Sequence, residues 1–305
     1  MNNYDWSSLP PLIKANLEPI RVYMEGDISN LYLNRPGEII LEWWNGKRVN
    51  KNAPELSGVW LEGMVRVLSG YYGVEKLENQ PMASLPLPGG HRMQVAMGDW
   101  VIGKHVCTIR FHRQQKLTIS DFNWHKNDAD LALQAIEKRK TILIAGATGV
   151  GKTALFNALL AHIPEHERIV IFEDVKELNP PQKNSVHLVA TDPLRSNIST
   201  ELPLRSSTAL LNLCLRLNPD RVMMGEIRQG NALAFFRLIQ TGHHGSIATI
   251  HANDADGAID ACLEYMLMQG DISAAAINFL QTQLRRNLDA VIIMEKGRVE
   301  FCSLQ

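Results

Sequence analysis

The sequence predicts an α/β fold for its second half, with a mostly parallel sheet covered by helices, preceded by a smaller α+β domain. After residue 130, short apolar runs alternate with helical stretches, an order typical of parallel sheets. The first of these runs leads directly into a glycine-rich loop and then a helix. The first half instead alternates short extended runs with turn signals. We therefore expect an N-terminal α+β domain over 1–115, a polar linker over 116–130 and a second domain over 131–305.

Length and composition suit a folded protein of two domains. The 305 residues exceed one typical domain. A net charge of −1 gives no global basic field for nucleic acid or for an anionic membrane. The four cysteines lie far apart, which argues against a disulfide framework or a zinc finger. No apolar run approaches the roughly 18 residues of a membrane span, and the N-terminus lacks a signal peptide pattern. We expect a cytoplasmic protein without a transmembrane segment, attached to a membrane only through partners.

The elements of the first half follow from its turn residues and apolar spacing. Asn34 to Gly37 is a turn signal between two extended runs, which indicates a hairpin. Apolar residues at helical spacing predict a helix further on. In chain order, we expect strands at 30–33 and 38–44, a helix at 59–68, a Pro/Gly loop at 85–90, and a strand pair at 92–97 and 106–111.

The second half is expected to begin with a helix and then alternate strands with helices. Expected strands are 141–145, 168–173, 186–190, 221–225, 246–250 and 289–294, with a terminal hairpin strand ending at Gln305. Expected helices are 129–138, 206–217, 230–241, 255–268 and 273–285.

The loop at 146–153 matches the phosphate-binding pattern G-x-x-x-x-G-K-[ST] without a mismatch. Its flanks, a β-branched strand and a helix, are the context that the pattern requires. The glycines allow several backbone N–H groups to face one anion at the positive end of the helix. Lys152 would reach the β- and γ-phosphates, and the Thr153 hydroxyl would bind Mg²⁺. The nucleotide-binding residues expected here are Gly146, Thr148, Gly149, Val150, Gly151, Lys152, Thr153 and Ala154.

Acidic residues follow two of the expected strands. Glu226 follows the strand at 221–225. Glu173 ends the strand at 168–173, Asp174 follows it directly, and Glu177 comes shortly after. Carboxyl ends of parallel strands share the edge at which the phosphate loop lies. The acids can therefore converge on one metal–phosphate site, where hydrolysis needs one group for Mg²⁺ and one for water. Each acid alone could instead cap a helix or lie in solvent.

Three histidines surround the strand at 246–250. His243 and His244 precede it, and His251 follows it. A zinc site is disfavoured because the spacing is not helical and a strand divides the three. We favour polar groups at the two ends of a strand that contact a γ-phosphate or respond to its loss.

Four motifs in this order resemble the secretion NTPase superfamily. They lie at 146–153, 171–178, 218–228 and 241–252, and in that family they are called Walker A, Asp box, Walker B and His box. The segments 34–38, 92–95 and 108–110 resemble the N-terminal domain of the bacterial type IV secretion traffic ATPases. The four-cysteine zinc subdomain of the type II secretion assembly ATPases is missing from the sequence.

The resemblance implies a RecA-like P-loop ATPase domain that uses ATP with Mg²⁺. Matched by position to the family motifs, Glu173 would be the Asp-box acid and a ligand of Mg²⁺, and Asp174 would contact the nucleotide. Glu226 would be the Walker B acid. His243 and His251 are the His-box residues, His251 the stronger candidate for a nucleotide contact. Arg92 and Arg110 match arginines expected near the γ-phosphate. His244 departs from the family pattern, and its role stays open.

The resemblance also implies a homohexameric motor at the inner membrane, working with channel components and a coupling ATPase of a type IV secretion or conjugation system. The exported substrate, protein or DNA–protein complex, stays open. One alternative is a type IV pilus assembly or retraction motor. Others are a nucleic-acid motor, disfavoured by the neutral charge, and a nucleotide-binding regulator of low turnover. No sequence-specific nucleic-acid binding is expected.

Overall fold

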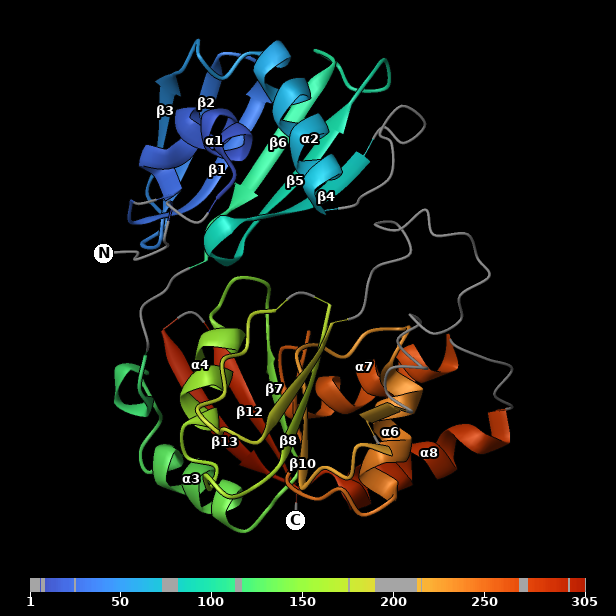
Figure 1. The fold of residues 1–305 in the computed structure, drawn as a ribbon. Coiled ribbons are helices and arrows are strands. Elements are labelled where there is room, and N and C mark those ends of the chain that lie inside the picture. Colours follow the sequence, from blue (N-terminus) through green and yellow to red (C-terminus); the bar gives the residue numbers. More distant parts are fainter. Residues whose placement is uncertain are drawn as a thin grey trace. The chain divides into compact units, whose positions relative to one another are not determined.

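The structure, a computed structural model, describes residues 6, 9–24, 26–72, 82–112, 117–174, 176–189, 213–214, 216–268, 274–295 and 297–304. The described residues up to 112 form one compact unit, and those from 117 on form a second (Figure 1). Each unit has its own apolar core. None of the helices in this described part of the chain combines the length and the apolar character that a membrane span requires.

The first unit is a six-stranded antiparallel sheet with two helices against one face (Figure 1). The strand order is β3-β2-β1-β6-β5-β4. Its elements are α1 (Pro11–Met24), β1 (Ile28–Arg35), β2 (Glu38–Trp43), β3 (Arg48–Asn52), α2 (Gly58–Tyr72), β4 (Met82–Leu87), the 3-10 turn η3 (Pro88–Gly90), β5 (His91–Met97) and β6 (His105–Arg110). The predicted hairpin, helix and strand pair are confirmed by β1 with β2, by α2, and by β5 with β6.

Two elements of this unit differ from the expectation. The first half of the segment expected as a loop over 85–90 belongs to strand β4, which pairs along β5, and only the rest forms the turn η3. Pro86 is tolerated because β4 lies at the edge of the sheet, where one side of a strand needs no ladder hydrogen bond. Helix α1 was not anticipated, because Pro19 interrupts its sequence; it buries Ile13, Leu17 and Ile20 at helical spacing.

The second unit is built on a seven-stranded sheet of order β13-β12-β7-β11-β10-β8-β9. All neighbouring strands are parallel except the terminal hairpin of β12 with β13. The strands are β7 (Ile142–Gly146), β8 (Ile169–Glu173), β9 (Ser185–Val189), β10 (Arg221–Met224), β11 (Ile247–Ile250), β12 (Ala290–Glu295) and β13 (Arg298–Ser303). The predicted α/β class with a mostly parallel sheet is confirmed.

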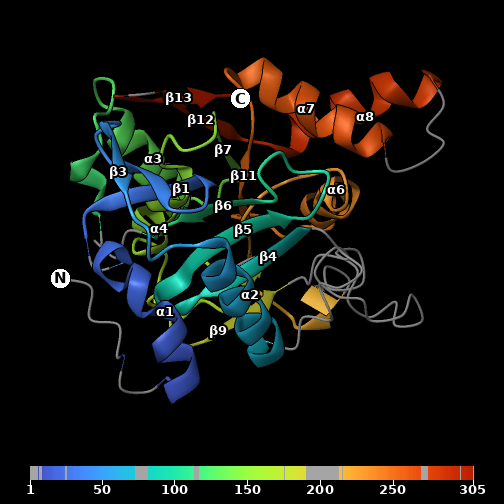
Figure 2. The same cartoon turned by 90° about the horizontal axis from the view of Figure 1, so that it is seen from above.

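Alternate side chains of these strands fill two separate cores, one on each face. On one face, Ile142 and Ile144 pack with α3 (Asp128–Glu137) and α4 (Lys152–Leu160). On the other, Leu143 and Ala145 pack with the second helix group. That group comprises α6 (Ala232–Gln240), α7 (Ala255–Leu267) and α8 (Ala274–Asn287). Figure 2 shows α7 and α8 side by side. The helix predicted over 206–217 falls largely outside the described residues.

The segment expected as a linker belongs to the second unit over its described part. The 3-10 turn η4 (Ile119–Asp121) buries Ile119 in the core beside α3 and α4. Trp124 bridges to Val299 of β13, and its indole N–H donates to the Ile119 carbonyl at 2.9 Å. From residue 117 on, the segment predicted as a linker therefore packs on the second unit, because a few apolar residues among many polar ones are enough to fix it to the core.

Candidate nucleotide site

The glycine-rich loop connects the buried strand β7 to helix α4 in the conformation its pattern predicts. A Cβ atom on Gly146 would lie 2.5 Å from the Met294 carbonyl oxygen, so no larger residue fits where the loop begins. Gly151 has φ +103° directly before the helix, a left-handed conformation that favours glycine. The first N–H groups of α4 have no partner within the helix, and together with the helix dipole they favour an anion.

Lys152 lies inside this loop and is 8% exposed. Its ammonium donates to the carbonyls of Gly146 at 2.6 Å and Ala147 at 2.9 Å. A third contact, of 3.2 Å, joins it to Nδ1 of His251, which follows β11. These contacts hold the ammonium at the loop.

His251 connects Lys152 to the acid that follows β10. Its Nε2 lies 2.7 Å from Oε1 of Glu226. Because Lys152 can only donate, Nδ1 accepts, and Nε2 carries the hydrogen that is donated to the carboxylate. The structure thus brings together three residues that the sequence assigned to one site, from the loop and from the ends of two strands.

Arg228, to which the sequence assigned no role, holds the other oxygen of Glu226. Its Nε donates to Oε2 at 2.9 Å, and Nη1 lies 3.2 Å from Oδ2 of Asp174. Asp174 directly follows β8, so the guanidinium spans the ends of two neighbouring strands. The signal that could have found Arg228 is its position two residues after Glu226, on the same strand-end turn.

Glu173 is 4% exposed and points into the segment that follows β8. Its Oε1 accepts the backbone N–H groups of Glu177 at 3.1 Å and Leu178 at 3.0 Å. Its Oε2 lies 2.9 Å from Nε2 of His187 on β9. A Cβ on Gly225 would lie 2.9 Å from Cγ of Glu173, so the glycine leaves the space that this side chain fills. Glu173 therefore anchors the segment, and its metal and catalytic roles stay predictions.

Glu177 is the acid that contacts the predicted Mg²⁺ ligand. The Thr153 hydroxyl donates to Oε2 of Glu177 at 3.1 Å. Asn157 of α4 fixes this segment, because its amide donates to the Glu177 carbonyl at 3.0 Å and accepts from the Asn179 N–H at 2.7 Å. A hydroxyl beside a carboxylate suits Mg²⁺, which prefers oxygen ligands. The sequence noted Glu177 after the strand but did not select it as a site residue.

Arg92 and Arg110 lie opposite one another on β5 and β6 of the first unit. Asn30 of β1 faces Arg110 from the other side. Like charges directly opposite in a sheet are unfavourable, and this face suits an anion. Their contact with a γ-phosphate stays a prediction.

Comparison with known proteins identifies the family. The model of the family described as "Type II/IV secretion system protein" matches residues 74–296. This chain belongs to that family. The type IV secretion system protein VirB11 of Bartonella henselae is 30% identical to the chain over 288 residues, covering 82% of this chain and 79% of that protein. The conjugal transfer protein TrbB of Rhizobium radiobacter is 31% identical over 283 residues, covering 90% and 81%.

The resemblance to the type IV secretion branch of this family is thereby confirmed. Among solved structures, the ATPase DotB of Yersinia pseudotuberculosis matches with a TM-score of 0.65 at 14% identity, covering 99% of this chain and 82% of that one. At that identity the likeness concerns the fold alone, which is the RecA-like P-loop fold expected from the motifs.

The His box of this family member divides between the two edges of the sheet. His251 follows β11 at the edge of the phosphate loop, whereas His243 precedes β11 at the opposite edge. His243 Nδ1 lies 3.2 Å from the Thr241 hydroxyl. Within this chain, the structure therefore does not bring His243 to the loop at which its nucleotide contact was predicted. In the described part of the chain, no group of three or more His, Cys, Asp or Glu residues is arranged to hold a metal ion.

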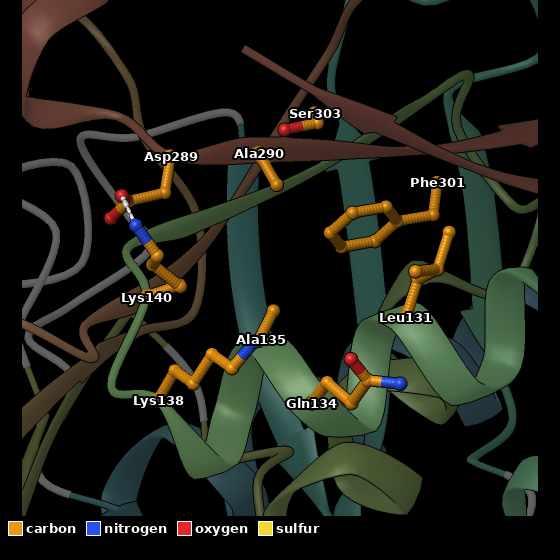
Figure 3. Close-up of a pocket in the computed structure, with 9 residues that line it drawn as sticks. All are labelled: Leu131, Gln134, Ala135, Lys138, Lys140, Asp289, Ala290, Phe301 and Ser303. Carbon is orange, nitrogen blue, oxygen red and sulfur yellow. Dashed lines mark hydrogen bonds and ion pairs between the residues drawn. The ribbon is translucent and has the colours of Figure 1, made fainter. Parts of the chain in front are cut away.

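A small pocket of about 180 Å³ also lies at the edge opposite the phosphate loop (Figure 3). Asp289, just before β12, and Lys140, just before β7, form an ion pair of 2.6 Å at its wall. The pocket is lined by Leu131, Gln134, Ala135, Lys138, Lys140, Asp289, Ala290, Phe301 and Ser303. Because Lys140 and Asp289 lie just before the amino ends of β7 and β12, the pocket is distinct from the candidate nucleotide site.

Proposed function

We propose that this protein is an ATP-hydrolysing motor, working with Mg²⁺, that energises substrate transfer or pilus assembly in a bacterial type IV secretion system. The observation that carries the proposal is the hydrogen-bonded path from Lys152 through His251 to Glu226. This path joins a phosphate-binding lysine to an acid suited to activate water. Two relatives, named as a type IV secretion system protein and a conjugal transfer protein, support the secretion role.

ATP binding begins with an exchange of partners at Lys152. In this structure its ammonium donates to the carbonyls of Gly146 and Ala147. On binding, the β- and γ-phosphate oxygens replace these neutral acceptors. A phosphate oxygen carries negative charge and attracts the ammonium more strongly than a neutral carbonyl oxygen does, so the exchange favours the bound state. The N–H groups at the start of α4 complete the phosphate cradle.

Thr153 and Glu177 are the residues that fit Mg²⁺ here, since their oxygens lie 3.1 Å apart beside the loop. When bound, Mg²⁺ neutralises charge on the β- and γ-phosphates. Glu226, with Oε1 on His251, orients the attacking water and accepts its proton. Glu173 acts through the segment that it anchors, because that segment carries Glu177.

We propose that Arg92 and Arg110 also act on the γ-phosphate. A planar, permanently charged guanidinium suits the charge that develops on the transferring phosphoryl group. The family assignment supports a homohexamer in the cytoplasm, bound at the inner membrane to channel components and a coupling ATPase.

Phosphate release by the purified chain with MgATP tests the proposed activity. The wild type should turn over, and Lys152→Ala should fall to background, because the ammonium that neutralises the phosphates is gone. Glu226→Gln should retain ATP binding but lose hydrolysis, because an amide fills the space without serving as a base. A Lys152→Ala protein with normal turnover would remove the proposal.

The same assay separates the alternatives. Stimulation by single-stranded DNA would favour a nucleic-acid motor, and binding without turnover would favour a regulator. Sizing with and without nucleotide tests the hexamer. Neighbouring genes for a secretion channel, rather than for a pilus, would support the secretion system over a pilus assembly or retraction motor.

A further inference from the structure

The turn that follows β10 carries Arg228 in a fixed position. Asn231, which is 3% exposed, accepts the Arg228 backbone N–H through Oδ1 at 2.8 Å. Its Nδ2 donates to the Glu226 carbonyl at 2.9 Å. The buried amide of Asn231 therefore closes the turn over 226–231. It fixes the backbone of both Arg228 and Glu226.

The carboxylate of Glu226 is divided between two partners. Oε1 lies 2.7 Å from His251 Nε2, and Oε2 accepts from Arg228 Nε at 2.9 Å. Arg228 Nη2 contacts the same Oε2, so two N–H groups of one fork share a single oxygen. Rotation of the carboxylate would break contacts on both sides. The orientation of the Glu226 carboxylate toward His251 therefore depends on the Arg228 guanidinium, which holds its other oxygen.

A second carboxylate holds the guanidinium from the other side. Nη1 of Arg228 lies 3.2 Å from Oδ2 of Asp174. The fixed fork of an arginine can bond two carboxylates at once with directional N–H groups, whereas a lysine ammonium acts as a point charge. The side chain is 55% exposed, so these ion pairs contribute little to stability.

We propose that Arg228 is a positioning residue of the hydrolytic site: it holds Glu226 with Oε1 toward His251 and the phosphate loop, and is itself aligned by Asp174. The proposal rests on the ATP hydrolysis put forward above. It assigns no contact with substrate to Arg228. A simpler possibility is that Arg228 only compensates the charges of two neighbouring carboxylates.

The primary test compares Arg228→Gln and Arg228→Lys with the wild type in steady-state ATP hydrolysis. A misaligned Glu226 should lower kcat by about 10-fold or more. KM and the Kd for ATP should change by less than about threefold, because the loop that binds phosphate is untouched. Arg228→Lys should recover only part of the loss, and thermal unfolding should be nearly unchanged. Arg237→Gln, an exposed arginine of α6, is the matched control and should turn over normally.

The double variant Arg228→Gln with Asp174→Asn separates positioning from charge compensation. If charge alone matters, removal of one acid together with the arginine restores turnover, and the positioning proposal is overturned. If Arg228 positions Glu226, the kcat of the double variant should stay as low as that of Arg228→Gln. Normal kcat in Arg228→Gln overturns the proposal and leaves the ATPase function intact. If the wild type hydrolyses ATP no faster than the Lys152→Ala variant, the proposed function is wrong, and so is the positioning role that rests on it.

Discussion

The Lys152 ammonium lies 3.2 Å from Nδ1 of His251, a residue 99 positions later in the chain. This contact joins the phosphate loop to the end of β11. His251 passes the connection on to Glu226 at the end of β10. In the proposed mechanism, a change of partner at Lys152 on ATP binding therefore acts directly on the hydrogen bond between His251 and Glu226, the proposed catalytic base.

His251→Ala should lower kcat by about 10-fold or more, because Glu226 loses the donor at Oε1 and Lys152 loses one acceptor. His251→Gln should lose less, since its amide offers both an acceptor and a donor. Steady-state ATP hydrolysis measures both. His243→Ala is the control from the other end of β11. Its turnover should be near normal, because His243 lies at the edge of the sheet opposite the phosphate loop. Equal losses in His243→Ala and His251→Ala would contradict the path through His251.

The two acids after β8 should fail in different ways. Glu177→Gln weakens the proposed Mg²⁺ site, so nucleotide binding should need more Mg²⁺ while the melting temperature stays unchanged. Glu173→Gln removes a buried carboxylate that accepts several N–H groups, so it should lower the melting temperature. Mg²⁺ titrations and thermal melts distinguish the two. A raised Mg²⁺ requirement in Glu173→Gln with an unchanged melting temperature would return the metal role to Glu173.

The sequence predicted the second unit well because its signals are local. A β-branched strand, three glycines and a helix start specify the loop at 146–153, and apolar runs specify the parallel strands. The convergence of Glu226 and His251 followed from one topological rule, that carboxyl ends of parallel strands share an edge. The same rule, applied to His243, shows that the His box cannot lie entirely at the loop.

The features that could not be predicted from the sequence depend on the direction of side chains and on which strands lie at the edge of a sheet. Glu173 and Glu177 are both acids at a strand end, and only the packing of Glu173 under Gly225 decides which one contacts Thr153. Pro86 indicated a loop from the sequence. Its place in an edge strand depends on the order of the strands in the sheet, which is not a local property of the sequence. Arg228 was overlooked because a charge on a turn is usually a solvated one.

Stability of the first unit should depend on pH through His91. This residue is 3% exposed, and Nδ1 accepts the backbone N–H of His112 at 2.8 Å. Burial, with a smaller contribution from the charge of His112, lowers the pKa of His91 to about 4. Between that value and the unfolded pKa of about 6.5, the unfolded chain binds the extra proton. Stability is therefore fully present above pH ~6.5 and lost as the pH falls toward ~4, by up to about 3 kcal/mol.

Hydrogen exchange of the β5 and β6 amides in the full chain measures this dependence. His91→Asn keeps an acceptor for the His112 N–H but does not titrate in this range, so its protection should vary less between pH 7 and pH 4.5. The same loss of protection in the variant and the wild type would assign the pH dependence to another group.

A buried ion pair should hold the amino edge of the second unit. Arg221 is 0% exposed, its Nη2 donates to Oε1 of Glu167 at 3.0 Å, and its Nη1 donates to the Ile136 carbonyl at 2.9 Å. Glu167→Gln leaves a buried positive charge without a counter-ion and should cost about 3–5 kcal/mol in the free energy of unfolding. Replacing both partners, Arg221→Met with Glu167→Leu, should cost less. Denaturant unfolding measures the three proteins, and a double variant less stable than Glu167→Gln would contradict the argument.

The arginine pair of the first unit tests whether both units take part in hydrolysis. Arg110→Ala removes one of two arginines that are paired residues of β5 and β6. If they meet the γ-phosphate, turnover should fall about 10-fold or more, and ATP binding should weaken more than ADP binding, since only ATP carries that phosphate. Arg35→Ala, an exposed arginine at the end of β1, is the control for charge in the same unit. Equal losses for ATP and ADP would place the pair elsewhere on the nucleotide. Unchanged turnover in Arg92→Ala and Arg110→Ala would mean that the second unit hydrolyses ATP without the first.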